Sequence, residues 1–205
     1  MFTYRQYSMR TLEYEDLQMI LEWRNSERVH SMMITDHKIS WEEHCNWFER
    51  IKNNPVKLHF VFEYESRPIG YIGYSDVDEE AGTCAPGIYI GDKQNLPPDA
   101  GIIIYYMCAA YAFEKLHMQR IDHFTLEKNV AAMTINKFIG FHEFGDDNFT
   151  INKNGKEELV IHLALTLEDW QALGAPLADF VKRGGVGSKS ILLLINSSSM
   201  FSEAA

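Results

Sequence analysis

The chain is short of the features that mark several classes of protein. Only three of its 205 residues are cysteines, Cys45, Cys84 and Cys108, and they are far apart. An odd, widely spaced set indicates neither a disulfide framework nor a zinc site, so we expect a reducing compartment and no metal. No apolar run is long enough to cross a bilayer, and the N-terminus lacks an apolar signal core. We therefore expect a cytoplasmic protein with no membrane partner.

Positive charge is also scarce, with 19 Lys and Arg against 29 Asp and Glu and a formal net charge of −10. Nucleic acids and anionic membranes need an excess of Lys and Arg, so we expect neither as the main partner, whereas a small anionic ligand needs only a few donors. Hydrophobic content of 46% is typical of a soluble globular chain. We expect one domain over residues 1–183 and a Gly/Ser-rich tail of unknown role over residues 184–205.

What the sequence does contain is an ordered series of helical and strand patterns. After a weak strand pattern at residues 5–12, helices are predicted at 14–24 and 41–52, the second with Ser40 and Glu43 as a capping box. Further strands are predicted at 57–64, 69–74, 83–90, 120–126, 144–151 and 157–165, and further helices at 102–116, 129–139 and 168–182. This order predicts an α/β fold with a mixed, mostly antiparallel sheet covered by helices.

One stretch organises the others. A short β segment, Gly87 to Gly91, is followed by a polar loop and by Pro97-Pro98-Asp99-Ala100-Gly101 at the start of the long helix. The first turn of a helix has N–H groups without intrahelical partners and a partial positive charge, so this arrangement can bind a pyrophosphate. The alternative is a simple strand–turn–helix connection in which the prolines start the helix.

Two further blocks carry a family signal. One is Asn129-x-x-Ala132 followed by Lys137-x-x-Gly140-Phe141. The other is Glu22-Trp23-Arg24-Asn25-Ser26 together with Ile39-Ser40-Trp41-Glu42-Glu43-His44-x-x-Trp47-Phe48. With the element order, these blocks resemble the GNAT acyl-CoA N-acyltransferase family over roughly residues 4–167. The last block is similar to the PseH-type branch of that family, which acetylates a UDP-linked 4-amino-4,6-dideoxy sugar.

The resemblance implies a seven-stranded sheet that splays between its fourth and fifth strands, with acetyl-CoA as co-substrate in the gap. The cofactor-binding residues that it implies are Ile88, Tyr89, Ile90, Ala100, Gly101, Ile102, Asn129 and Asn136. The sequence departs from the family at Asp99, which stands in place of a glycine. A carboxylate there would itself satisfy helix N–H groups and repel phosphate. Asn136 stands where a proton-donating Tyr is expected. Asn129 and Gly140 are equally interpreted as helix caps.

The chemistry implied is direct attack of a neutral amine on the thioester, with a carboxylate or His receiving the proton through water. Glu127 is the first catalytic candidate because it follows the fifth strand beside the splay, and His123 and Tyr74 are second candidates. The alternative for Glu127 is a solvated loop carboxylate. A lone strand His is more often structural than catalytic.

Four residues of the helical front are predicted to bind the acceptor. Arg24 and Asn25 end a helix, where a cation can face a nucleotide diphosphate, although a simple helix-end charge and breaker are an equal alternative. His44 and Trp47 share one helix face, and Trp47 can stack on a base or sugar ring or else pack in the core.

These observations lead to one predicted function and two alternatives. We expect an acetyl-CoA-dependent N-acetyltransferase whose acceptor is a nucleotide-linked amino sugar of the pseudaminic-acid type. The alternatives are a RimJ/RimL-type protein N-terminal acetyltransferase and a non-catalytic GNAT-like binding module. A homodimer is left open.

Overall fold

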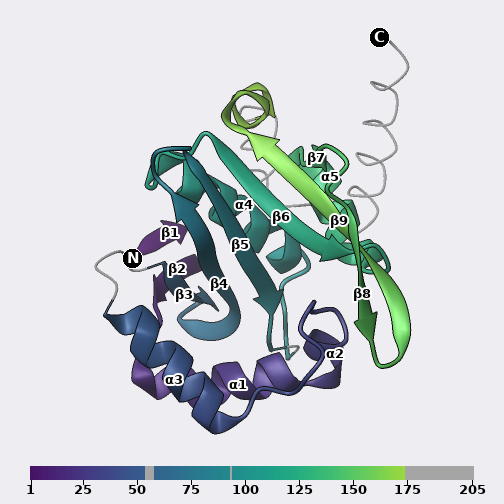
Figure 1. Cartoon of the computed structure of the whole chain (residues 1–205). Coiled ribbons are helices and arrows are strands. Elements are labelled where there is room, and N and C mark those ends of the chain that lie inside the picture. Colours follow the sequence, from purple (N-terminus) through teal and green to yellow (C-terminus); the bar gives the residue numbers. More distant parts are fainter. Residues whose placement is uncertain (54–57, 93, 174–205) are drawn as a thin grey trace.

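A computed structural model describes residues 1–53, 58–92 and 94–173. Figure 1 shows one twisted sheet with helices on both faces. The sheet has nine strands in the order β1-β2-β3-β4-β5-β6-β9-β7, with β8 paired to β9. The strands are β1 (Phe2–Tyr4), β2 (Tyr7–Thr11), β3 (His59–Tyr64), β4 (Arg67–Asp78), β5 (Thr83–Ile90), β6 (Arg120–Leu126), β7 (His142–Glu143), β8 (Phe149–Lys153) and β9 (Lys156–Thr166). The helices are the 3-10 turn η1 (Tyr14–Asp16), α1 (Leu17–Asn25), α2 (Glu27–His30), α3 (Trp41–Lys52), α4 (Ala100–Glu114) and α5 (Val130–Ile139).

The alternation of side chains along the strands divides the core between the two faces of the sheet. On one face, Ile72 and Tyr74 of β4 pack with α4 in the larger cluster. On the other face, Val61 and Tyr71 pack with Leu17 and other residues of α1 and α3. Successive strand residues point to opposite faces, so neighbours on one strand serve different helices.

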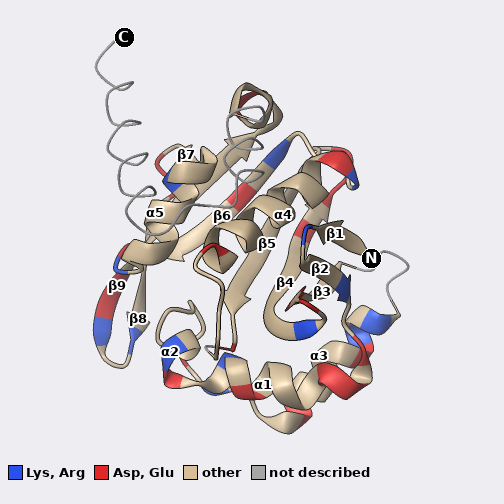
Figure 2. Ribbon diagram, turned by 180° about the vertical axis from the view of Figure 1, so that it is seen from behind, with Lys and Arg blue, Asp and Glu red and all other residues tan. Residues whose placement is uncertain are grey.

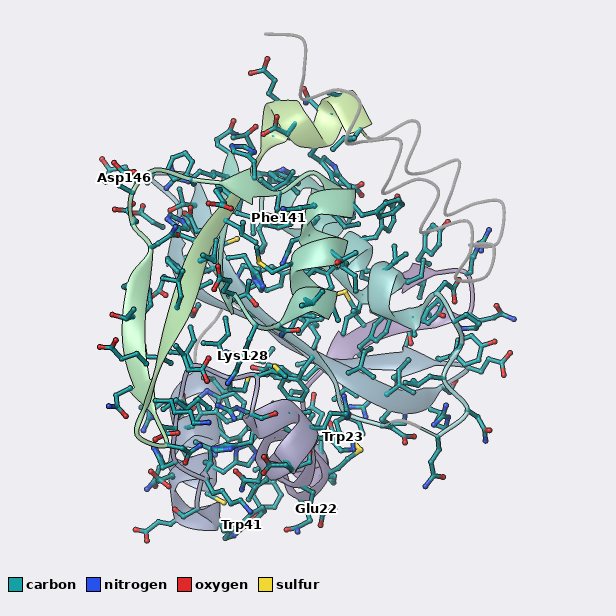
Figure 3. The ribbon with its side chains drawn as sticks, turned by 90° about the vertical axis from the view of Figure 1, so that its right-hand side faces the viewer. Glu22, Trp23, Trp41, Lys128, Phe141 and Asp146 are labelled. Atoms are coloured by element: carbon teal, nitrogen blue, oxygen red, sulfur yellow. The ribbon has the colours of Figure 1, made fainter. Side chains whose placement is uncertain are left out.

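Helix α4 belongs wholly to the larger cluster. Figure 2 shows it in tan along most of its length, and Glu114 is the only charged residue in its sequence. A helix that is apolar on all sides is a buried helix. Its burial against β4 and β5 therefore fixes the start of α4 next to the end of β5, where the predicted anion site lies.

The predicted helix caps are confirmed by the structure. Ser40 accepts a hydrogen bond from the Glu43 amide, and the Glu43 carboxylate accepts one from the Ser40 amide, which is a complete capping box. Asn129 Oδ1 accepts from the Ala132 amide at the start of α5. Gly140 ends that helix at a φ of 103°, a left-handed conformation that favours glycine.

The strand count is higher than predicted. The single strand expected at residues 5–12 is a hairpin of β1 and β2, with Arg5 at a φ of 54° in the turn between them. The two-residue β7 is a further strand that alternation cannot reveal. Residues 167–173 are helical, as predicted for the start of the last helix. The rest of that helix and the tail at 184–205 lie outside the described residues.

The predicted splay is present between β5 and β6. These two strands are parallel neighbours and pair at only two positions, Thr83 with Arg120 and Cys84 with Ile121. Beyond these pairs the strands diverge, as Figure 1 shows. By contrast, β5 pairs with β4 as far as Ile90, and β6 pairs with β9 as far as Leu126. The sheet is therefore continuous on both sides of an unpaired stretch between β5 and β6, which widens toward the ends of the two strands and which we call the slot.

Candidate active site

The open edge of β5 offers main-chain groups to the slot. The carbonyl of Pro86 lies 3.2 Å from His123 Nδ1 on β6, and the carbonyl of Ile90 accepts a 2.8 Å hydrogen bond from Arg28 of α2. Alternate residues of a strand point to the same edge, so Ile88 faces the slot as well. The N–H and C=O of Ile88 and the N–H of Ile90 are thus available there for a hydrogen-bonding ligand.

Tyr89 differs from its neighbours, because its main chain faces β4. Gly91, two residues after Tyr89, turns its main chain to the same edge, and its amide donates to the Ile69 carbonyl of β4. The Tyr89 carbonyl itself lies against Gly70 of that strand. The main-chain contact predicted for Tyr89 therefore does not fit, since only Ile88 and Ile90 turn toward the slot. The Tyr89 side chain instead lines a pocket on the face of the sheet that α1 and α3 cover.

The start of α4 lies at the end of the loop that follows β5. The Ala100 amide donates to the Pro97 carbonyl, and the Ile102 amide donates to the Asp99 carbonyl. In residues 1–53, 58–92 and 94–173, the amides of Asp99 and Gly101 have no hydrogen-bond partner. Of the three amides predicted there, Ala100, Gly101 and Ile102, only that of Gly101 is free. Asp99 supplies a second free amide.

The expected conflict at Asp99 does not occur. Its carboxylate makes no cap hydrogen bond to the helix. Asp99 Oδ1 instead accepts a 2.6 Å hydrogen bond from the hydroxyl of Tyr7 on β2. A β-carbon at Gly101 would meet nothing closer than Ile135 Cδ1 at 3.4 Å, so the helix start is also open sterically. This combination of free amides and open space fits an anion such as a pyrophosphate.

A pocket of about 580 Å³ lies on the α1/α3 face, next to β5. Its lining comes from α1, the 35–39 segment, α3, β4 and β5, namely Ile20, Arg24, Thr35, His37, Ile39, Glu43, His44, Asn46, Trp47, Arg50, Tyr71 and Tyr89. Three of the four residues predicted to bind the acceptor, Arg24, His44 and Trp47, are brought together here. A volume of this size suits a small-molecule ligand.

Aromatic rings form a continuous layer on the wall of this pocket. His44 stacks on Trp47 with ring centroids 5.1 Å apart, and Trp47 meets the edge of His59 at 5.3 Å. Tyr71 stacks on Tyr89 at 5.2 Å. Stacked and edge-to-face rings hold each other in place, so the wall presents fixed ring faces. Trp47 packs against the smaller core cluster, as one of its two predicted roles requires, and it also lines the pocket. Its stacking on a base or sugar ring stays a prediction.

Arg24 is the most unusual group in the pocket. It makes no hydrogen bond or ion pair with any residue in the described part of the chain, and its Nη1 is buried without a partner. Burial lowers the pKa of its guanidinium, an effect that the nearby Tyr89 hydroxyl opposes. A partly buried guanidinium without a counter-charge is costly, and an anionic ligand would remove that cost.

Asn25 does not line the pocket, in contrast to the prediction. Its Nδ2 donates to the Ile39 carbonyl at 2.7 Å, and its Oδ1 accepts from the Ile39 amide at 2.8 Å. Ile39 lies near the end of the segment of residues 31–40, and the buried Lys153 of β8 holds the beginning of that segment. Lys153 donates to the carbonyls of His30, Met33 and Thr35 at 3.0, 2.7 and 3.0 Å. Asn25 and Lys153 together fix the pocket wall over residues 31–40.

The three catalytic candidates lie in different environments. Tyr74 is buried in the core, where its hydroxyl donates to the Cys108 carbonyl at 2.7 Å, and burial raises its pKa well above the usual value. This placement on the α4 face argues against a catalytic role. Burial lowers the pKa of His123 to about 4, so its ring is neutral near pH 7. Glu127 is exposed directly after β6. None of the three is among the residues that line the pocket.

The two asparagines of α5 also differ. Asn129 Oδ1 is used in the N-cap, which leaves only its Nδ2 for a ligand. Asn136 is fully buried, and neither Oδ1 nor Nδ2 has a partner among the described residues. A buried amide without partners is uncommon and costs stability. Its side chain therefore has free hydrogen-bonding capacity but no proton to give at neutral pH.

Sequence reasoning missed several residues of the pocket, above all Tyr71, Glu43 and Arg50. The signal for Tyr71 was present, since it is the β4 residue opposite Tyr89 in the register, but pairing two strands requires knowing that register. The role of Arg28, which donates to the carbonyls of Ile90 and Gly91, had no local signal at all.

Two features are absent from the described residues. No helix in the described part of the chain is both long and apolar enough to span a bilayer. Nor do residues 1–53, 58–92 and 94–173 contain a group of three or more His, Cys, Asp or Glu arranged to hold a metal ion.

Comparison with known proteins agrees with this geometry. A spermidine N-acetyltransferase from Vibrio cholerae, solved with CoA and spermine, superposes with a TM-score of 0.74 at 18% identity, covering 82% of this chain and 99% of its own. A GCN5-related N-acetyltransferase from Brucella melitensis gives 0.68 at 16% identity, covering 88% and 84%. A putative phosphinothricin N-acetyltransferase gives 0.65 at 19% identity, covering 78% and 98%. No sequence among the curated proteins matches.

The solved structures establish the fold, and the sequence itself establishes the family. The model of the acetyltransferase (GNAT) domain matches residues 9–158, which include the splayed strands, the start of α4 and the lining of the pocket. The chain belongs to the GNAT family and is an acetyl-CoA-dependent N-acetyltransferase.

Proposed function

We propose that the acceptor is the amine of a nucleotide-linked amino sugar, such as a UDP-4-amino-4,6-dideoxy sugar of the pseudaminic-acid type. The observation that carries the proposal is the unpaired Arg24 guanidinium beside the ring faces of Trp47 and Tyr89 in one pocket. A guanidinium favours a phosphate oxygen, and flat rings favour a sugar or a base.

The donor side of the proposal uses the slot between β5 and β6. Acetyl-CoA, when bound, supplies the acetyl thioester that the amine attacks, forming a C–N bond as the C–S bond breaks. The free main-chain groups of Ile88 and Ile90 would hold the pantetheine arm. The free amides of Asp99 and Gly101 would hold the pyrophosphate. The unused Nδ2 of Asn129 and the unpartnered side-chain amide of the buried Asn136 would be the groups of α5 that bind an amide-rich arm.

The proton lost by the amine needs an acceptor but not a strong base, because a sugar amine titrates close to neutrality. Glu127 and His123 stay our candidates, through water. Glu43 joins them as the one carboxylate in the pocket lining, with a pKa that the Ser40 amide lowers. Glu127→Gln, His123→Gln and Glu43→Gln are compared by the pH profile of kcat/KM. The variant in which the profile changes identifies the proton acceptor.

The pocket charges favour this acceptor over a polyamine. One solved relative is described as a spermidine N-acetyltransferase, and spermidine is a polycation. Here the lining has two arginines, Arg24 and Arg50, against the single carboxylate of Glu43. Two positive groups would repel a polycation, whereas a polyamine site needs several acidic groups.

Acceptor choice tests the proposal. The protein is incubated with acetyl-CoA and, separately, a UDP-4-amino-4,6-dideoxy sugar, a peptide with a free N-terminus, and spermidine, while thiol release is followed. We expect the highest kcat/KM with the nucleotide sugar. A higher value with the peptide would favour the RimJ/RimL-type alternative, and a higher value with spermidine would favour a polyamine enzyme. If no thiol is released with any of the three acceptors and calorimetry shows no heat of CoA binding, the result would favour a non-catalytic module.

Assembly is a separate part of the proposal. A homodimer stays open, and one solved relative is described as dodecameric. Light scattering coupled to size exclusion gives the mass directly.

A further inference from the structure

We infer that Tyr7 is a positioning residue for coenzyme A, because its hydroxyl holds the Asp99 carboxylate away from the amides that start α4. The inference rests on the donor site described under the proposed function. It concerns the donor alone, so it does not depend on which acceptor is correct.

The Tyr7 hydroxyl is held rigidly in place. Tyr7 lies on β2 and is 3% exposed. Its ring stacks on Phe62 of β3, with centroids 5.3 Å apart and planes 7° apart, and leans on Tyr64 at 5.0 Å. The hydroxyl donates to Asp99 Oδ1 at 2.6 Å, across 92 positions of sequence. The geometry therefore links the sheet to the loop that precedes α4.

This hydroxyl is a donor at all working pH values. Burial raises the pKa of Tyr7 far above its usual value, and the Asp99 carboxylate raises it further. The proton thus stays on the phenol, and Asp99 always has a partner on the side away from the helix.

Without this partner, Asp99 would compete with a ligand for the helix start. A carboxylate at the first turn is attracted by the partial positive charge there and commonly accepts hydrogen bonds from the free N–H groups. Those groups are the amides of Asp99 and Gly101, which are unpartnered within the described residues. Removing the Tyr7 hydroxyl would let the carboxylate approach them and repel a diphosphate.

The test is a double-mutant cycle read by calorimetry with coenzyme A as the ligand. The four proteins are the wild type, Tyr7→Phe, Asp99→Ala and the double variant. We expect Tyr7→Phe to raise the Kd for coenzyme A by about three- to tenfold. In the Asp99→Ala background, Tyr7→Phe should have no effect, because no carboxylate is left to move. Thermal unfolding of each variant checks that it is folded.

Two controls separate this effect from packing. Tyr4→Phe removes a neighbouring hydroxyl that makes no hydrogen bond to Asp99, and it should leave the Kd unchanged. S-acetylpantetheine lacks the diphosphate, so its use as a donor should be insensitive to Tyr7→Phe.

Three results would overturn the inference. Tyr7→Phe leaves coenzyme A binding unchanged, or it weakens binding equally in both backgrounds, which would mean that Tyr7 acts through packing. Failure of the wild-type protein to bind coenzyme A would remove the donor site itself. A wrong acceptor would leave all of these binding measurements intact, so the two proposals fail separately.

Discussion

Replacing Arg24 with methionine separates the role of this residue in binding from any role in folding. Arg24 lies in the last turn of α1 and lines the pocket, but it has no hydrogen bond or ion pair with the described residues, and burial lowers the pKa of its guanidinium. Methionine keeps the length and apolar contacts of the side chain. The variant therefore loses the charge and the hydrogen-bonding group but little packing.

The substitution should lower kcat/KM but should not lower the free energy of unfolding. Hydrogen bonds to charged groups contribute about 1.5–3 kcal/mol, so kcat/KM for a nucleotide-linked amino sugar should fall about 10- to 140-fold. In the free protein the same substitution removes a partly buried charge that has no partner. Its free energy of unfolding should therefore be unchanged or rise by up to about 1 kcal/mol.

The assay compares two acceptors, the nucleotide-linked sugar and the same free 4-amino sugar without the nucleotide, by thiol release from acetyl-CoA. Arg24→Met should impair only the first, and Arg24→Lys should lie between wild type and Arg24→Met because it keeps charge but loses the planar fork. Urea unfolding measures stability. Equal losses on both acceptors together with a destabilised fold would refute the reasoning, since Arg24 would then be structural.

Three further predictions concern the donor site, pH and the pocket wall. Gly101→Val should raise the Kd for coenzyme A because its methyl groups crowd Ile135 and the helix start. Gly101→Ala is the control, since its β-carbon would lie 3.4 Å from Ile135 Cδ1, an ordinary contact. An unchanged Kd in the valine variant counts against a pyrophosphate there. His123 has its pKa lowered from 6.5 to about 4, so its contribution to stability is complete above pH 6.5 and is lost as pH falls toward 4, amounting to about 3 kcal/mol. This slope, measured by urea unfolding, should become smaller in His123→Gln, whereas His59, whose pKa burial also lowers to about 4, keeps its own share of it. A slope that is the same in His123→Gln and in the wild type would contradict the prediction. Lys153→Met removes the donor that the carbonyls of His30, Met33 and Thr35 share, so it should destabilise the protein by about 2 kcal/mol and raise the KM for the acceptor. An unchanged KM would mean that the pocket wall keeps its position without Lys153.

Local sequence patterns were enough to predict most of the elements. Ser40 and Glu43 mark a helix start, and Gly140 marks a helix end, because caps depend on neighbours within a few residues. The hairpin of β1 and β2 was missed because its turn has Arg5 in a left-handed conformation that non-glycine residues rarely adopt.

The details of the site depended on contacts that are distant in sequence. The Asp99 carboxylate was predicted to accept hydrogen bonds from the amides at the start of the helix. Only its contact with Tyr7 shows why it does not. Tyr74 was predicted as catalytic, but strand parity places it on the α4 face, opposite Tyr71 and the pocket. Arg24 was predicted to bind the acceptor, which stays a prediction, and both its place in the pocket lining and its lack of a partner are visible only in three dimensions.

The central claim is that the slot between β5 and β6 holds acetyl-CoA, and a crystal structure with coenzyme A tests it most directly. The account predicts that the pantetheine arm lies along the open edge of β5, with hydrogen bonds to the Ile88 main chain. It also predicts pyrophosphate oxygens within hydrogen-bond distance of the Asp99 and Gly101 amides. Coenzyme A bound elsewhere, or β5 and β6 paired along their full length with the slot closed, would contradict it.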